Sequence, residues 1–328
     1  MPRLIYFTIG GLLLLTACRE AEVPTPEPQP EPETVVSYEA YLEPVEEAVY
    51  KEDLFNGSPG FPTYWPQDQY DYRLPCFNPS DPYEIAYLRK DRDVLGECPG
   101  AVFIFSFRTG EARQVASNAC YGLDWSSTGW LIYTGIDRKI WKVKANGDSL
   151  TQLTFGEGFH NNATWNPNGQ YFVSNQGYMT SDGELVKEVP VSAYDWIDEH
   201  RYLCSDTEGL AAFDLRTHSF ETFFPGESLL NISYFKPEEM AIYVQPTLKR
   251  WKYFLRFDLQ QQRIDTLRRM YKTYAYGVGD YAHQTERAIV PLVRQDWKDS
   301  LANEIYYRQH LLVLDEEGNE MGLVQLPE

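Results

Sequence analysis

The chain has 328 residues, in which 48 Asp and Glu residues outnumber 29 Lys and Arg residues and give a formal net charge of −19 at pH 7. This excess of negative charge repels phosphate groups, so it excludes nucleic acid as a partner and electrostatic docking on anionic lipid. A chain of this length has room for one large domain with a sizeable core.

Residues 1–17 have the pattern of a secretory signal peptide. A charged start, Met1-Pro2-Arg3, precedes an apolar run from Leu4 to Leu14, which is too short for a membrane span of about twenty residues. The next stretch, Leu15-Thr16-Ala17-Cys18, resembles the bacterial lipobox, which implies cleavage before Cys18 and lipidation of its thiol. An ordinary signal peptide followed by an unrelated cysteine is the alternative interpretation. A lipidated Cys18 would hold the protein to a membrane through acyl chains alone.

Residues 18–34 are predicted to be a linker. They are rich in Pro and Glu, a composition that cannot bury apolar surface and that favours extended polyproline geometry. Acidic residues close behind the cysteine resemble the surface-export signal of Bacteroidetes lipoproteins, although Arg19-Glu20-Ala21-Glu22 fits that signal only loosely. The sequence therefore predicts an outer-membrane lipoprotein and leaves open whether it faces the periplasm or the cell surface.

Residues 35–69 are predicted to be an N-terminal extension that caps the following domain. Tyr38–Phe55 combines apolar and acidic residues with weakly helical spacing, and Asn56–Gly60 is a cluster of turn-forming residues. We expect the only helix of the chain in this segment.

A repeated motif indicates the architecture of the rest. Trp125-Ser126-Ser127-Thr128-Gly129 returns as Trp165-Asn166-Pro167-Asn168-Gly169, and short strands follow each copy. A four-stranded antiparallel unit that repeats at about forty residues is typical of a propeller blade, because one short meander cannot bury both of its faces alone. We expect Trp125 and Trp165 to wedge between neighbouring blades.

The same period divides residues 70–328 into six predicted blades. Their outer turns fall near residues 110, 147, 183, 217, 261 and 318. The last blade supplies all four of its strands from the C-terminal end, so we expect the ring to close without a strand from the N-terminus. The predicted fold is all-β: a six-bladed β-propeller of four-stranded antiparallel blades.

The tryptophan motifs and the ending Gln152-Leu153-Thr154 resemble the TolB-like (WD40-like) propeller repeat, and the resemblance covers residues 70–328. It implies a six-bladed propeller that serves as a rigid protein-binding platform in the cell envelope. Relatives that carry a fused hydrolase domain are enzymes, but no such domain fits within this length.

No catalytic or cofactor motif is present in the sequence. It contains no Gly-x-Ser-x-Gly elbow, no phosphate-binding glycine loop and no His-Glu-x-x-His, and its five histidines lack metal-ligand spacing. We therefore expect no cofactor and no metal. Residues distant in sequence can still converge at a channel mouth, which keeps an enzyme as an alternative.

Four cysteines remain besides Cys18. In an exported protein we expect one disulfide, between Cys98 and Cys120, because both are predicted on the same face of the ring. Cys76 and Cys204 are predicted to be small buried hydrophobic residues.

The candidate binding site lies in the loops that enter the first strand of each blade. These loops share one face and combine tyrosines with polar amides, a composition suited to a peptide or glycan. The candidate residues are Tyr121, His160, Asn161, Asn162, Tyr194 and Tyr274. Turn chemistry and packing between blades are the alternative explanation of the same residues.

The sequence thus predicts a membrane-anchored envelope lipoprotein whose propeller is a non-catalytic scaffold for a protein partner, within an envelope complex. A carbohydrate-binding or carbohydrate-active propeller, with lyase-like or hydrolase-like chemistry at the channel mouth, is the alternative.

Overall fold

The computed structural model describes residues 37–45, 70–91, 100–191, 193–205, 209–225, 232–236, 241–244, 251–258, 261, 263–271, 279–299 and 304–327. This part of the chain is all-β and contains no α-helix. None of its helices is long and apolar enough to cross a membrane. The predicted signal peptide and linker, including Cys18, lie outside the described residues.

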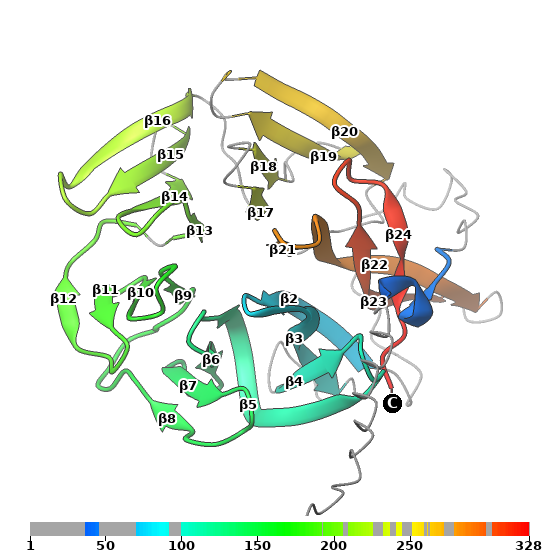
Figure 1. Cartoon of the computed structure of the whole chain (residues 1–328), viewed down its shortest axis with the longest axis horizontal. Coiled ribbons are helices and arrows are strands. Elements are labelled where there is room, and N and C mark those ends of the chain that lie inside the picture. Colours follow the sequence, from blue (N-terminus) through cyan, green and yellow to red (C-terminus); the bar gives the residue numbers. More distant parts are fainter. Residues whose placement is uncertain are drawn as a thin grey trace, which may run out of the picture. The chain divides into compact units, whose positions relative to one another are not determined.

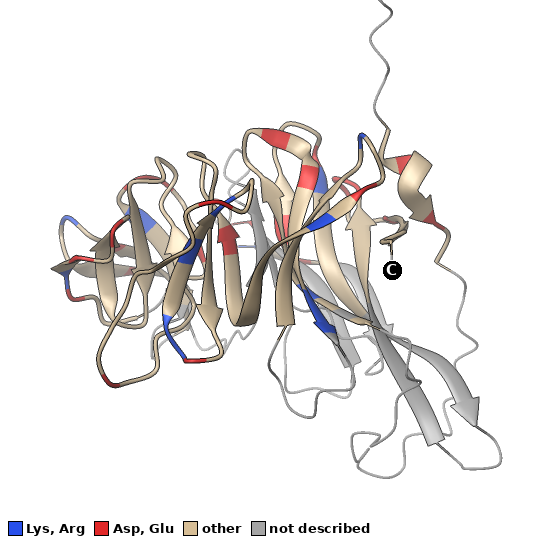
Figure 2. Ribbon diagram, turned by 90° about the horizontal axis from the view of Figure 1, so that it is seen from below, with Lys and Arg blue, Asp and Glu red and all other residues tan. Residues whose placement is uncertain are grey.

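Antiparallel sheets stand side by side around a central axis, which is the arrangement of a β-propeller (Figure 1). In three of them, strands that are consecutive in the chain are neighbours in the sheet, so each sheet is a simple four-stranded meander. Seen from the side, the strands run between the two faces of the ring (Figure 2). Short turns on both faces therefore bring distant segments of the chain together.

The largest sheet has seven strands because one long strand belongs to two meanders. Strand β5 (Ala112–Trp125) pairs with β4 along its first part and with β6 along its second part. The chain passes from the outside of one meander to the inside of the next as one strand with register shifts. The other strands of this sheet are β2 (Tyr70–Asn78), β3 (Asp81–Asp91), β4 (Gly100–Ser106), β6 (Trp130–Gly135), β7 (Ile140–Lys144) and β8 (Thr151–Gln152).

Three four-stranded sheets follow in chain order. The first contains β9 (Thr164–Trp165), β10 (Tyr171–Ser174), β11 (Gly177–Thr180) and β12 (Leu185–Lys187). The second contains β13 (Asp195–Trp196), β14 (Arg201–Ser205), β15 (Gly209–Asp214) and β16 (Ser219–Pro225). The third contains β17 (Ile232–Lys236), β18 (Ala241–Val244), β19 (Trp251–Asp258) and β20 (Arg263–Tyr271).

The last sheet takes four strands from the C-terminal end, as predicted, and one more from the N-terminus. Its members are β21 (Asp280–Ala282), β22 (Arg287–Asp299), β23 (Glu304–Leu314), β24 (Glu320–Val324) and β1 (Leu42–Glu43). Strand β1 pairs with β24 at the outer edge, with Leu42 opposite Val324. The expectation that no strand from the N-terminus takes part was therefore wrong, because β1 extends the last sheet.

The N-terminal segment 37–45, which we call the strap, corrects the expected helix. Only Tyr38–Tyr41 is helical, as a single 3-10 turn (η1), and strand β1 follows at once. The acidic and apolar residues of this segment are spaced too irregularly for a longer helix, and pairing with β24 satisfies the backbone instead. Residues 46–69 lie outside the described part of the chain.

The strap covers the seam where the first and last meanders meet. The Tyr38 hydroxyl donates to the Pro82 carbonyl and lies 3.1 Å from Thr285 Oγ1, so one side chain contacts both meanders. The Tyr41 ring lies over Gly110, whose φ is +71° and whose missing Cβ leaves room for the ring. Gly110 therefore meets two demands, a left-handed turn and a close aromatic contact.

The hydrophobic core consists of clusters between adjacent meanders rather than one central core. Trp125 is 3% exposed, and its cluster joins residues of β2–β5 to residues of β6 and β7. Trp165 is 4% exposed and packs with Ile132 and Ile140 on one side and Phe172 on the other. Both tryptophans fill the positions between meanders that the repeat predicts.

Candidate binding pocket

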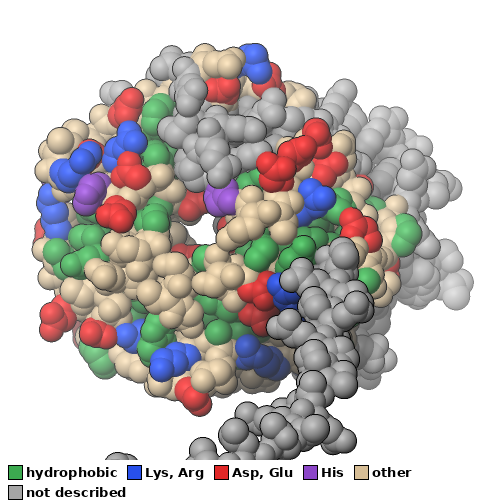
Figure 3. Space-filling view, in the orientation of Figure 1, with side chains coloured by type: hydrophobic (Ala, Val, Ile, Leu, Met, Phe, Trp, Pro, Cys, Tyr) green, Lys and Arg blue, Asp and Glu red, His purple; other side chains and the backbone are tan. Residues whose placement is uncertain are grey.

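A pocket of about 500 Å³ lies at the centre of the ring on one face, and Figure 3 shows the opening at this centre. Its walls come from the inner strands and from the turns that follow them. Residues from five inner-strand regions reach it: Phe77–Pro79, Asp124–Ser127, Thr164–Pro167, Asp195–Glu199 and Asp280–Gln284. Because meanders far apart in the chain each supply one segment, the ring itself shapes the pocket.

Three partly buried aspartates occupy the same position in three inner strands. Asp124, Asp195 and Asp280 each stand one residue before an aromatic residue, and each carboxylate accepts the backbone N–H of that residue at 2.7–2.8 Å. The sequence analysis missed these residues because it aligned the aromatic positions alone. The repeated pair of Asp and aromatic residue was the signal that could have found them.

Two of these carboxylates also connect neighbouring meanders. Asp124 Oδ2 accepts the backbone N–H of Trp165 at 2.6 Å, and Asp280 Oδ2 accepts that of Phe77 at 2.7 Å. Charge-assisted bonds to backbone N–H groups are stronger than neutral ones. Both aspartates therefore hold the ring together at the same place where they line the pocket.

The electrostatics of the pocket favour protonation. Burial raises the pKa of Asp124 to about 6, against the opposing effect of the Trp165 and Trp125 N–H groups. Burial, opposed by the Phe77 N–H and reinforced by the charge of Asp124, raises the pKa of Asp280 to about 7. Burial and the charge of Asp280 raise the pKa of Asp195 well above its usual range. The three groups destabilise one another's charge, so a cation that enters the pocket is attracted by all of them.

The free thiol of Cys76 lies close to this acidic centre. Burial, followed by the charges of Asp124 and Asp280, raises its pKa well above the usual range, so the thiol stays protonated and unreactive. Within the described ranges, no group of three or more His, Cys, Asp or Glu side chains has the arrangement of a metal site.

The residues predicted as a site lie elsewhere. Tyr121, His160, Asn161 and Asn162 precede the inner strands, at the ends opposite the pocket turns, and none of them lines the pocket. The Tyr121 and Phe159 rings meet edge to face at 6.0 Å, which brings Tyr121 to the loop of the other three residues. Tyr194 precedes β13 in the next sheet, and Tyr274 lies outside the described residues. A binding role for this face stays a prediction.

The cysteines follow the expected division. Cys120 is disulfide-bonded, whereas Cys76 and Cys204 are free and buried. Cys98 lies outside the described residues, so the pairing of Cys98 with Cys120 stays a prediction.

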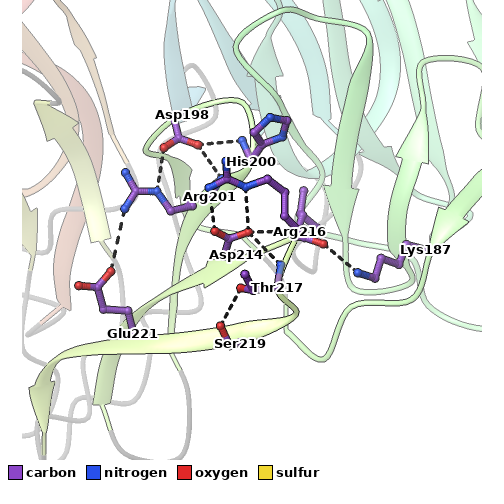
Figure 4. A network of polar contacts seen from close by, with 10 residues as sticks. Lys187, Asp198, His200, Arg201, Asp214, Arg216, Thr217, Ser219 and Glu221 are labelled. Atoms are coloured by element: carbon purple, nitrogen blue, oxygen red, sulfur yellow. Dashed lines mark hydrogen bonds and ion pairs between the residues drawn. The ribbon is translucent and has the colours of Figure 1, made fainter.

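A second, smaller pocket of about 240 Å³ lies on the β13–β16 sheet, where a network of ion pairs surrounds it (Figure 4). Arg201 Nε bonds Asp198 Oδ2 at 2.8 Å, and Arg216 Nη2 bonds Asp214 Oδ2 at 3.0 Å. Each guanidinium already has a carboxylate partner. The hydrogen bond from Arg216 is the largest of the effects that lower the pKa of Asp214 to about 2. These contacts fix the hairpin turns, and the pocket offers no unpaired charge to a ligand.

No protein-family model and no curated protein matches the chain. Among solved structures, a protein of Agrobacterium tumefaciens assigned as TolB is 13% identical, with a TM-score of 0.50 over 67% of this chain and 88% of that one. TolB from Acinetobacter baumannii is 13% identical, with a TM-score of 0.41 over 76% of this chain and 53% of that one. An oligogalacturonate lyase in complex with manganese is 10% identical, with a TM-score of 0.47 over 77% of this chain and 76% of that one. The last two likenesses are too distant to carry an argument, and the first shows the fold alone: this chain has the fold of a TolB-like β-propeller.

Proposed function

We propose that the protein is an outer-membrane lipoprotein, anchored through Cys18, whose propeller is a non-catalytic scaffold for an envelope protein. The acidic pocket at the centre of the ring carries this proposal. It presents three carboxylates at a place where segments of four sheets converge, and a rigid ring positions them at little ordering cost. We also infer six blades, because the shared strand β5 turns the seven-stranded sheet into two meanders.

The pocket fits a cationic side chain of the partner. The carboxylate oxygens of Asp124 and Asp280 already accept backbone N–H groups, and each oxygen keeps a second lone pair for a ligand. A lysine or arginine would stabilise the charged form of all three carboxyl groups at once. The partner is therefore expected to present a basic residue on a protruding segment, consistent with its attraction to an acidic protein.

The test compares two matched double variants. Both variants replace two carboxyl groups by amides: Asp195→Asn/Glu199→Gln does so in the pocket, and Glu111→Gln/Glu184→Gln does so at two exposed positions elsewhere. Each is used as bait in an envelope extract, and captured proteins are quantified by mass spectrometry. We expect at least one protein to be captured by the wild type and by the surface variant, and tenfold less by the pocket variant. Equal capture by both variants, at unchanged melting temperatures, would contradict the role of the pocket.

One observation favours the alternative, a carbohydrate-active propeller. Carboxyl groups with pKa values of about 6 and about 7 can act as general acids near neutral pH. Turnover of an oligosaccharide by the wild type, lost in Asp280→Asn and retained in Glu184→Gln, would establish this activity in place of the scaffold. The absence of turnover together with partner capture would leave the scaffold as the function.

A further inference from the structure

The loop 155–162, between β8 and β9, exposes aromatic side chains on the face opposite the acidic pocket. Phe155 is 70% exposed and Phe159 is 37% exposed, and Ile136 in the neighbouring turn is 51% exposed. We call this loop, together with Tyr121 and the turn 135–139, the aromatic platform. Exposed apolar clusters on a folded surface mark interaction sites.

Several polar contacts fix this loop in one conformation. The Phe159 carbonyl accepts hydrogen bonds from Asn175 Nδ2 at 2.7 Å and Gln176 Nε2 at 3.3 Å, and the Gly158 carbonyl accepts one from Lys139 Nζ at 2.9 Å. Gly156 and Gly158 have positive φ angles, and a Cβ on either would meet no atom within 4 Å. The aromatic rings are therefore held out to solvent by a built loop, which lowers the ordering cost of binding.

Three polar residues in or next to the platform have a strained backbone. Asn118, Arg138 and Asn162 all have φ between +52° and +62°. Such conformations persist only where the surroundings enforce them, and they gather at functional sites. At Asn118 and Asn162 these conformations direct the side-chain amides to the surface beside the aromatic rings.

The charged side chains of the platform balance one another, because Arg138 and Lys139 offset Asp137 and Glu157. Arg138 lies 5.5 Å from the centre of the Phe159 ring, and Lys139 is held by the Gly158 carbonyl, so both cations are engaged. The side-chain amides of Asn118, Asn161 and Asn162 make no hydrogen bond to any described residue. Beneath them His160 is 7% exposed, and its ring nitrogens have no partner at hydrogen-bonding distance. Burial and the charge of Lys139 lower the pKa of His160, and the nearby Glu157 carbonyl has the opposite, smaller effect. The imidazole is therefore neutral at pH 7.

Aromatic rings beside uncommitted amides are the chemistry that recognises a sugar, because ring faces stack on C–H groups while amides pair with hydroxyl groups in both directions. We infer that the aromatic platform binds a neutral oligosaccharide. The acidity of the whole chain disfavours an anionic polysaccharide. This site is separate from the acidic pocket and does not depend on it.

The test is affinity electrophoresis of the full chain in a polyoxyethylene detergent, which carries no sugar head group. The gels contain starch, hydroxyethylcellulose, laminarin or mannan as neutral polymers, or polygalacturonate as the anionic control. We expect at least one neutral polymer to retard the wild type, and Phe155→Ala/Phe159→Ala to weaken the apparent affinity at least tenfold. The matched control is Leu185→Ala/Val186→Ala, which removes two side chains of 53% and 52% exposure from β12 and should leave retardation unchanged.

The amides are tested by Asn118→Gly/Asn162→Gly, because glycine keeps the left-handed backbone while it removes the side chains. This variant should lose affinity for the neutral polymer without a loss of fold. No retardation by any neutral polymer, stronger retardation by polygalacturonate, or undiminished retardation of the Phe155→Ala/Phe159→Ala variant would overturn the inference. Loss of a captured protein by that variant without retardation of the wild type would assign the platform to a protein partner instead. The pocket variant Asp195→Asn/Glu199→Gln should still be retarded, so failure of the scaffold proposal and failure of this one are distinguishable.

Discussion

Asp124 and Asp280 show how one residue type serves packing and recognition together. Each accepts one N–H from its own strand and another from the next meander, yet burial raises the pKa of each carboxyl. Hydrogen bonds to the charged form lower a pKa, so burial and mutual repulsion outweigh two N–H donors here. The folded protein therefore binds protons at these sites that the unfolded chain releases.

This difference predicts how stability depends on pH. In the unfolded chain such a carboxyl titrates near 3.9, whereas in the fold Asp124 titrates near 6 and Asp280 near 7. Between about pH 4 and pH 7 the folded state binds more protons, so the free energy of unfolding falls as pH rises through this window, on the order of 3–4 kcal/mol per group. Urea denaturation at pH 5 and pH 8 measures the slope. It should be shallower in Asp280→Asn and unchanged in Glu184→Gln; identical slopes in all three proteins would contradict the assignment.

The burial of Trp165 leads to a second prediction about a single residue. Its ring is 4% exposed and packs edge to face on Phe172 at 5.7 Å, between two sheets. Trp165→Ala should reduce the free energy of unfolding by about 3–5 kcal/mol, as expected for truncation of a large buried aromatic residue. Phe155→Ala, which removes a ring that is 70% exposed, is the control and should change stability little. A similar loss in both variants would contradict the packing role.

At the scale of elements, the turns and the repeat could be predicted, whereas the connections between meanders could not. Backbone hydrogen bonds close predicted outer turns at Gly110, Gly147, Gly183, His218 and Gly318. Strand β1 was missed because two residues carry no periodicity, and its pairing with β24 arises only when the chain's ends meet. The pocket was missed for a related reason: Asp124, Asp195 and Asp280 are far apart in sequence and meet only when the ring forms.

The strap gives a prediction with an internal control. Gly110→Ala and Gly129→Ala both place a side chain at positive φ, +71° and +82°, but only the first meets the Tyr41 ring, since nothing lies within 4 Å of the second. The two variants therefore share the cost of placing a side chain at positive φ. Any difference between their effects reports the contact between Tyr41 and residue 110. Gly110→Ala should speed amide hydrogen exchange at Leu323 and Val324 in β24, and Gly129→Ala should not. Equal exchange in both would show that Tyr41 does not hold the strap.

At the scale of the whole molecule, the two ends of the inner strands present different chemistry. The pocket on one face is acidic and ringed by carboxylates, and the platform on the other is neutral and aromatic. The strap lies on the pocket side, because Tyr38 contacts Pro82 and Thr285 in turns next to the pocket lining.

Anchoring is tested through Cys18→Ala. The wild type should partition into the detergent phase of a Triton X-114 separation and incorporate labelled palmitate, because a lipidated cysteine is the only anchor that we propose. The variant should do neither, while its propeller keeps the melting temperature of the wild type. Unchanged partitioning of the variant would refute lipid attachment at this residue.

The pairing of β1 with β24 also sets the path along which a pulling force travels. If the chain is held at residue 18, tension reaches the folded part first at the strap, where Leu42 and Glu43 pair with Val324 and Leu323. The next described strand along the chain is β2, whose Phe77 is bonded to Asp280 at the heart of the ring. While the strap is attached, load on the anchor would be carried by the Tyr38 contacts with Pro82 and Thr285 and by the pairing of β1 with β24. The strap would therefore be loaded before β2.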